Sequence, residues 1–277
     1  MLKKRIIAKL EIKGENLVKG VSLEGLRVLG KPEYFSKIYY ECGVDELIYQ
    51  DVVASLYGKN TLFETIFKTS KKIFIPLTVG GGIKKLSEIY KVLRAGADKV
   101  SINSQAIKKP QLIYDAVKVF GKSTIVANVE VLKKNNDYFC YYNNGRTPAN
   151  LKAEEWIIKL QKLGIGEIIL TFIDYDGTGK GFDLEFINKI EKLVTSPLII
   201  SGGAGNVKQI KSLFKKTNAS GVAIGSLLHY NLIQGKKLIE KDFISEGNID
   251  FIKKNNSINK KFENRPVDKL FKKLSKF

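Results

Sequence analysis

The sequence predicts a closed barrel of eight parallel strands surrounded by helices, the (β/α)8 TIM-barrel fold, built from two half-barrel repeats. Eight short apolar runs alternate with helical patterns along about 230 of the 277 residues, a length typical of this fold. Strands that alternate with helices form parallel sheets with right-handed crossovers. In addition, short motifs of the first half recur in the same order in the second half.

The expected elements follow one another in a regular order. The strands are expected at 5–12, 46–51, 75–79, 99–102, 123–130, 167–173, 198–201 and 221–224. The helices between them are expected at 32–42, 61–70, 84–95, 110–120, 153–163, 183–193 and 207–215. Each strand together with the helix that follows it makes one unit of the barrel.

The repeat has an offset of about 120 residues. The glycine-rich run at Gly80 recurs at Gly202, and the strand at 99–102 recurs at 221–224. Glu11 corresponds in the same way to Glu130. A repeat of this kind predicts two half-barrels related by a pseudo-twofold axis.

Composition limits the classes of function. Lys and Arg number 47 against 28 Asp and Glu, a net charge of +19, but the basic residues are spread along most of the chain. No aromatic-interleaved basic motif accompanies them, so a nucleic-acid partner is not expected. The single histidine, His229, excludes a multi-histidine metal site and is expected to be structural. Neither a metal nor a cofactor is expected.

The location and the domain boundaries are also expectations from the sequence. Two cysteines, Cys42 and Cys140, suit a reducing cytoplasm. No apolar run is long enough to span a membrane, and the basic start lacks the apolar stretch of a signal peptide. We therefore expect a cytoplasmic protein with a barrel at 1–254 and a basic C-terminal tail, helical or frayed, at 255–277.

Two glycine-rich segments follow expected strands. Glycine lets a backbone approach an anion closely, and this fold commonly binds phosphate after strands seven and eight. The repeat places an equivalent site after strands three and four. We expect one phosphate site at Gly81, Gly82, Asn103 and Ser104 and another at Gly202, Gly203, Gly225 and Ser226. Alternatively, the glycines only permit tight turns.

Two glutamates occupy equivalent strand ends. Inward-pointing residues alternate along barrel strands, so Glu11 and Glu130 are expected to face each other at the carboxyl-terminal mouth. Two carboxylates that flank a substrate can divide the roles of general acid and general base. Asp51, Asp174 and Asp176 are also expected to cluster at the ends of strands two and six. The alternative role of these carboxylates is to cap turns or to pair with Lys9.

Eight segments carry a combined signature that is far more specific than any one glycine run. They are Arg5-Ile6-Ile7-Ala8, Val18-Lys19-Gly20, Asp45-Glu46-Leu47, Thr78-Val79-Gly80-Gly81-Gly82-Ile83, Gly96-Ala97-Asp98-Lys99-Val100-Ser101-Ile102-Asn103, Gly166-Glu167-Ile168, Asp174-Tyr175-Asp176-Gly177-Thr178 and Ser201-Gly202-Gly203-Ala204-Gly205. Together they resemble the cyclase subunit (HisF) family of imidazole glycerol phosphate synthase over roughly residues 1–250.

The resemblance implies a barrel that forms a heterodimer with a glutaminase subunit. Ammonia from glutamine would pass through the barrel and convert a bis-phosphorylated formimino carboxamide ribonucleotide to imidazole glycerol phosphate and an aminoimidazole carboxamide ribotide, a lyase reaction of histidine biosynthesis. The resemblance implies Glu11 and Glu130 as the acid and base and Asp176 as the residue that orients the substrate. It adds Gly177 and Thr178 to the substrate-binding residues.

The resemblance also gives a role to charged residues at the opposite end of the barrel. Arg5, Glu46, Lys99 and Glu167 match a ring of alternating charges that the family uses as its ammonia entrance. Asp98 matches a residue at the glutaminase interface. The alternative is a ring that serves only stability, as is usual at this end of the fold.

The chain departs from the family pattern near the expected chemistry. Glu11 and Glu130 replace aspartates, Lys9 and Asn128 replace small residues, and the loop 135–146 lacks the usual pattern. An inward Lys9 is expected to pair with Glu11 or Glu130, or to have a lowered pKa.

These departures keep two alternatives open. The first is ammonia delivery for acetamidino modification of a sugar in surface polysaccharide or sialic-acid-like biosynthesis. The second is a non-catalytic basic binding module that acts through the tail, with salt-dependent binding.

Overall fold

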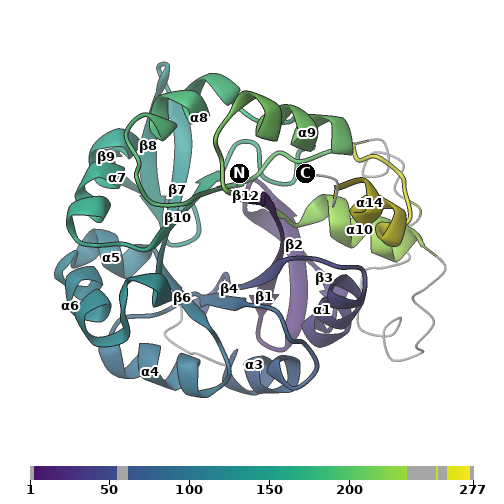
Figure 1. Ribbon diagram of the computed structural model, residues 1–277, viewed down its shortest axis with the longest axis horizontal. Helices are drawn as coiled ribbons and strands as arrows, with labels where there is room; N and C mark the ends of the chain where they lie inside the picture. The colour runs from purple at the N-terminus through teal and green to yellow at the C-terminus, as the bar shows by residue number, and fades with distance from the viewer. Residues whose placement is uncertain (1–2, 55–61, 236–253, 255–260, 275–277) are drawn as a thin grey trace.

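Eight parallel strands close into a barrel in this protein. The computed structural model describes residues 3–54, 62–235, 254 and 261–274. The barrel strands, in order around the barrel, are β1 (Arg5–Lys13), β4 (Glu46–Asp51), β5 (Leu77–Gly80), β6 (Lys99–Ile102), β7 (Ile125–Lys134), β10 (Glu167–Phe172), β11 (Leu198–Ser201) and β12 (Gly221–Ile224). Parallel pairing of β12 with β1 closes the ring, and the helices surround it (Figure 1). The predicted (β/α)8 fold is confirmed.

Helices connect the strands on the outside. They are α1 (Pro32–Glu41), α3 (Leu62–Ser70), α4 (Leu86–Arg94), α5 (Ser104–Lys108), α6 (Gln111–Phe120), a 3-10 turn (Lys122–Thr124), α7 (Ala153–Lys162), α8 (Leu184–Glu191), α9 (Val207–Lys216) and α10 (Ser226–Gln234). The sequence pattern does not predict α10, because all its residues except Gln234 are buried and it has no polar face. No helix in the described parts of the chain is long and apolar enough to cross a membrane.

Each half of the barrel carries an antiparallel extension on its first strand. Strands β2 (Asn16–Val21) and β3 (Glu24–Gly30) extend β1, and strands β8 (Asp137–Tyr142) and β9 (Thr147–Lys152) extend β7. The sequence pattern predicts a fifth strand that ends at residue 130, whereas β7 continues to Lys134. Asn135 and Asn136, which follow it, have positive φ values of 48° and 68°. Two such residues form the tight turn that returns a strand on itself.

The interior of the barrel is layered from its amino-terminal to its carboxyl-terminal end. Inward residues alternate along each strand. A charged ring lies at the amino-terminal end, and above it is a buried apolar layer composed of Ile7, Ile48, Val126, Ile169, Ile199 and Ala223. Lys9 and Asn128 come next on their strands, followed by Glu11 and Glu130, and all four are buried. Glu11 and Glu130 therefore lie at the carboxyl-terminal mouth, with Lys9 and Asn128 directly beneath them.

The described part of the predicted tail packs on the barrel. Helix α14 (Val267–Leu274) contacts α9 and α10 and buries Leu270 and Phe271. Just before it, the Phe262 ring lies 5.3 Å from the Tyr230 ring, centroid to centroid. The predicted boundary between residues 254 and 255 stays a prediction, and 255–260 and 275–277 lie outside the described residues.

Candidate active site at the carboxyl-terminal mouth

The first of two pockets at the mouth lies where β4, β5 and β6 end. Gly81, Gly82, Asn103 and Ser104 all line it, so the structure brings these four predicted residues together. A Cβ atom at Gly81 would lie 2.4 Å from the backbone oxygen of Asp51, and the φ of Gly81 is +109°. Glycine is therefore required for both space and backbone conformation at this position.

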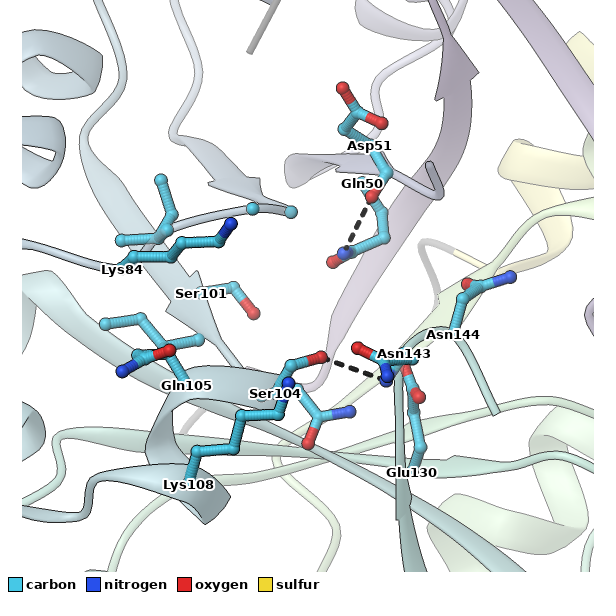
Figure 2. Close-up of a pocket in the computed structure, with 15 residues that line it drawn as sticks. Gln50, Asp51, Lys84, Ser101, Ser104, Gln105, Lys108, Glu130, Asn143 and Asn144 are labelled. Carbon is cyan, nitrogen blue, oxygen red and sulfur yellow. Dashed lines mark hydrogen bonds between the residues drawn. The ribbon is translucent and has the colours of Figure 1, made fainter. Parts of the chain in front are cut away.

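The wall of this pocket suits an anion (Figure 2). Lys84 and Lys108 line it. The buried Ser101 hydroxyl has no hydrogen-bond partner within the described part of the chain. The Ser104 hydroxyl oxygen accepts a hydrogen bond from the Asn143 backbone N–H at 2.9 Å, which leaves its own proton to donate. Hydroxyl donors beside two lysines are suited to a phosphate group.

The second pocket lies across the mouth, where β10, β11 and β12 end. Its lining includes the predicted residues Gly177, Gly202, Gly203, Gly225 and Ser226. A Cβ atom at Gly203 would lie only 1.8 Å from a neighbouring backbone oxygen. The Ser226 hydroxyl is buried and lacks a partner among the described residues. This pocket therefore has the same design as the first: glycines that open space and a hydroxyl left for a ligand.

Thr178 is the one predicted binding residue that lines neither pocket. Its hydroxyl donates to the backbone oxygen of Tyr175 at 2.7 Å and accepts from the backbone N–H of Lys180 at 3.3 Å. Its side chain thus stabilises the turn after β10.

A buried ion-pair triad joins the second pocket to one of the two glutamates. The Lys19 ammonium lies 2.7 Å from Glu11 Oε1 and 2.6 Å from Asp176 Oδ2, with all three residues buried. Burial alone would lower the pKa of Lys19, but the carboxylates of Asp176 and Glu11 outweigh it and raise that pKa. Burial raises the pKa of Glu11, and the Lys19 charge opposes this shift. Lys19 is absent from the predicted site residues, although it lies in one of the eight signature segments.

Glu130 has different surroundings. Its Oε1 accepts from the Asn128 side-chain amide at 3.2 Å, and its Oε2 accepts from the Gly145 backbone N–H at 2.8 Å. Burial raises the pKa of Glu130 to about 6, and the charge of Lys9 opposes the rise. A carboxyl group with a pKa near neutrality can both accept and return a proton.

Other polar residues near the mouth agree with the expectations only in part. The Lys9 ammonium donates to the Ser201 hydroxyl at 3.2 Å, and Glu11 pairs with Lys19 rather than with Lys9. Asp51 lines the first pocket, but its Oδ1 caps the following turn through two backbone N–H groups. Asp174 lines neither pocket. The three aspartates at the strand ends therefore do not form one cluster.

The four charged residues at the amino-terminal end form a closed ring. Arg5 contacts Glu46 at 2.8 Å and also pairs with Glu167. Lys99 contacts Glu46 at 3.2 Å and Glu167 at 3.1 Å. Each charge therefore has two opposite partners. Asp98 lies beside the ring in sequence, is exposed, and accepts a hydrogen bond from the Leu77 backbone N–H.

His229 is a buried structural residue, as predicted. Its Nδ1 lies 2.7 Å from the Tyr39 hydroxyl, and its Nε2 lies 3.1 Å from the Lys9 carbonyl oxygen. A carbonyl only accepts, so Nε2 carries the proton and Nδ1 accepts from Tyr39. Burial is the main reason why the pKa of His229 is lowered to about 3, from an ordinary value of 6.5.

Between these two pKa values the unfolded chain binds a proton on His229 and the folded protein does not. Stability is therefore lost as the pH falls from about 6.5 toward 3. We expect His229→Gln, which keeps a donor and an acceptor, to flatten this loss. Urea midpoints of both proteins at pH 7 and pH 4.5 measure it. If the urea midpoint falls equally between pH 7 and pH 4.5 in the wild type and in His229→Gln, protonation of His229 is not the cause of the loss.

Known proteins resemble this chain in sequence over most of its length. Residues 5–234 match the family model described as "Histidine biosynthesis protein". The chain belongs to this family. This histidine-biosynthesis family member is 47% identical to imidazole glycerol phosphate synthase subunit HisF of Legionella pneumophila over 206 residues, 74% of this chain and 97% of the relative. It is 43% identical to HisF of Bacillus cereus (strain G9842) over 231 residues, 83% and 92% of the two chains.

The HisF of Clostridium botulinum (strain Kyoto / Type A2) is 40% identical over 240 residues, which cover 86% of this chain and 95% of the relative. The matched region of the family model includes all eight barrel strands and both pockets.

Proposed function

We propose that this chain is the cyclase subunit of an imidazole glycerol phosphate synthase. It uses ammonia to convert a bis-phosphorylated formimino carboxamide ribonucleotide to imidazole glycerol phosphate and an aminoimidazole carboxamide ribotide. The observation that carries the proposal is the pair of anion-suited pockets on opposite sides of two buried glutamates. The HisF relatives support it, and they lend no support to sugar amidination or to a basic binding module.

The geometry supports a role for each group. One phosphate binds in each pocket, which holds the reacting atoms between Glu11 and Glu130. Glu130, with a pKa of about 6, exchanges protons with the substrate. Lys19 and Asp176 hold Glu11 on the opposite side. Fixing both ends of the substrate converts an encounter with ammonia into a reaction within one assembled site.

The opposite end of the barrel is the proposed docking face for a glutaminase subunit, with the charged ring as the ammonia entrance. Phe74 supports this face because it is 82% exposed just before β5. It lines a groove with Pro76, Leu77 and Asp98. Exposed aromatic residues beside polar groups are typical of interface anchors.

Phe74→Asp is expected to weaken the partner complex and leave the barrel mouth intact. Glutamine-dependent turnover with the glutaminase present should therefore fall by about tenfold or more, whereas ammonium-dependent turnover stays unchanged. Tyr90→Asp is the control, because Tyr90 is 57% exposed in the middle of α4 and away from the groove. Equal losses of both activities in Phe74→Asp would contradict the docking role.

The test of the proposed function is a turnover assay of the purified chain with ammonium salt. The ribonucleotide precursor should yield imidazole glycerol phosphate and the ribotide in equal amounts, and omitting ammonium should abolish both. Absence of product at high enzyme concentration would contradict the proposal. A sugar acceptor would then remain, detectable as an amidino mass lost from a glycan when the gene is deleted.

A further inference from the structure

The layer directly beneath the two glutamates is unusually polar. Lys9 and Asn128 precede Glu11 and Glu130 by two residues on equivalent strands, so each pair shares an inward face. Both are at least nine-tenths buried, at 6% and 3% exposure. Buried polar groups require partners, and these partners differ between the two halves of the barrel.

Asn128 connects two elements through its side-chain amide. Its oxygen accepts from the Thr171 hydroxyl at 2.9 Å, and its nitrogen donates to Glu130 Oε1 at 3.2 Å. Thr171 is fully buried on β10, the strand that pairs with β7. The hydroxyl thereby fixes which end of the amide faces Glu130. Lys9, the equivalent residue of the first half, donates to Ser201, and Glu11 forms its ion pair with Lys19.

The Glu130 carboxylate is consequently held at both oxygens. Oε1 receives Asn128, and Oε2 receives the Gly145 backbone N–H at 2.8 Å. A glutamate has one more rotatable bond than an aspartate, and two donors remove the resulting freedom of the carboxylate. Placement matters because a misplacement of about 1 Å can reduce a rate by about 10²-fold.

We propose that Asn128, anchored by Thr171, is the positioning residue that aims the Glu130 carboxylate at the substrate. This inference rests on the proposed function, in which Glu130 exchanges protons. It adds Asn128 and Thr171 to the proposed site, although neither residue lines a pocket.

The charged and polar groups that face Glu130 determine how its titration responds. Lys9 and Glu11 face it from β1, Asn103 from the end of β6, and the Gly145 N–H from the turn after β8. Of these, Lys9, Asn103 and Gly145 stabilise the ionised form and Glu11 opposes it. Removal of the Asn128 donor takes away one more hydrogen bond to that form, so the pKa of Glu130 should rise.

The experiment compares Asn128→Ala, Thr171→Val and Thr171→Ser in the ammonium-dependent assay. Asn128→Ala should lower kcat by about 10- to 100-fold with little change in KM, because substrate binding through the phosphates persists. The pH limb of kcat/KM that Glu130 controls should move upward. Thr171→Val should also lower kcat and move this pH limb upward, each by less than Asn128→Ala does. Thr171→Ser, which keeps the hydroxyl, should behave like the wild type.

Coupling separates positioning from general damage to the fold. Because Thr171 acts through Asn128, the Asn128→Ala/Thr171→Val double variant should be no slower than Asn128→Ala alone. Multiplicative losses, or an Asn128→Ala enzyme with wild-type kcat and pH profile, would overturn the proposal. Thr171→Val changes little volume and keeps the test available if Asn128→Ala does not fold.

A second readout does not need turnover. The pKa of Glu130 can be followed by carbon NMR of the side-chain carboxyl, assigned with Glu130→Gln. It should rise by about half a unit or more in Asn128→Ala. If the wild-type protein has no cyclase activity but Asn128→Ala still raises the pKa of Glu130, the proposed function is refuted and the hydrogen-bond network stands. An unchanged pKa would refute the positioning role itself.

Discussion

Glu130→Gln is expected to reduce ammonium-dependent turnover by about 10²- to 10⁴-fold, because the amide cannot exchange a proton with the substrate. The amide keeps nearly the volume of the carboxyl, so the barrel should remain folded. KM should change little, since the two pockets proposed to hold the phosphates keep their glycines and hydroxyls. Steady-state kinetics measure both parameters, and the residual activity should lack the pH limb near 6 that the proposed mechanism assigns to Glu130.

Glu24→Gln is the matched control for this change. Glu24 lies at the exposed start of β3 and pairs at the surface with Arg146, with a nitrogen-to-oxygen distance of 3.0 Å. Surface pairs of this kind contribute little to the free energy of folding. A Glu130→Gln enzyme that turns over as fast as this control would remove Glu130 from the mechanism.

Lys19→Met is expected to destabilise the protein by about 3–5 kcal/mol, because it leaves two buried carboxylates without their shared cation. In the variant, burial and the charge of Asp176 both raise the pKa of Glu11, and of the two lysine charges that oppose them only that of Lys9 remains. A carboxyl whose pKa in the folded state is raised destabilises the fold increasingly as the pH rises above the ordinary pKa of the free group. The deficit should therefore be largest at neutral pH and shrink as the pH falls toward the ordinary value for glutamate.

Urea unfolding at pH 7.5 and pH 5 measures this effect. Lys68→Met provides the control, since Lys68 pairs with Glu64 on the solvent-exposed face of α3 and its loss should leave the midpoint unchanged. A Lys19→Met variant with the same midpoint as the control at both pH values would show that the triad does not stabilise the fold. Ammonium-dependent turnover should also fall, because Glu11 and Asp176 then repel each other at the mouth.

The architecture and the residues at strand ends were predictable because they follow from periodicity. Alternation of strands and helices gives the barrel, and the period of two along a strand places Glu11 and Glu130 inside it. The repeat then predicts a second glycine pocket from the first. None of these inferences needs a contact between residues distant in sequence.

The rest depends on segments that leave the repeating pattern. Lys19 reaches Glu11 only because β2 folds back on β1, a hairpin that alternation of strands and helices does not indicate. Alternation along the strand predicts that Lys9 points inward. Its partner is Ser201 rather than a carboxylate, because β11, a strand far along the chain, places this hydroxyl beside it. Thr178 directly follows Gly177, which lines the second pocket, but the turn directs the Thr178 hydroxyl to the backbone oxygen of Tyr175.

Each cation of the charged ring contacts both glutamates, so the ring can lose one cation and still leave each glutamate paired. If Lys99 swings out to water, Arg5 still contacts both Glu46 and Glu167; if Arg5 moves away, Lys99 still contacts both. An ordinary buried pair loses its countercharge when one member moves, at a cost of several kcal/mol. In this ring, each glutamate keeps one cationic partner when either cation moves away.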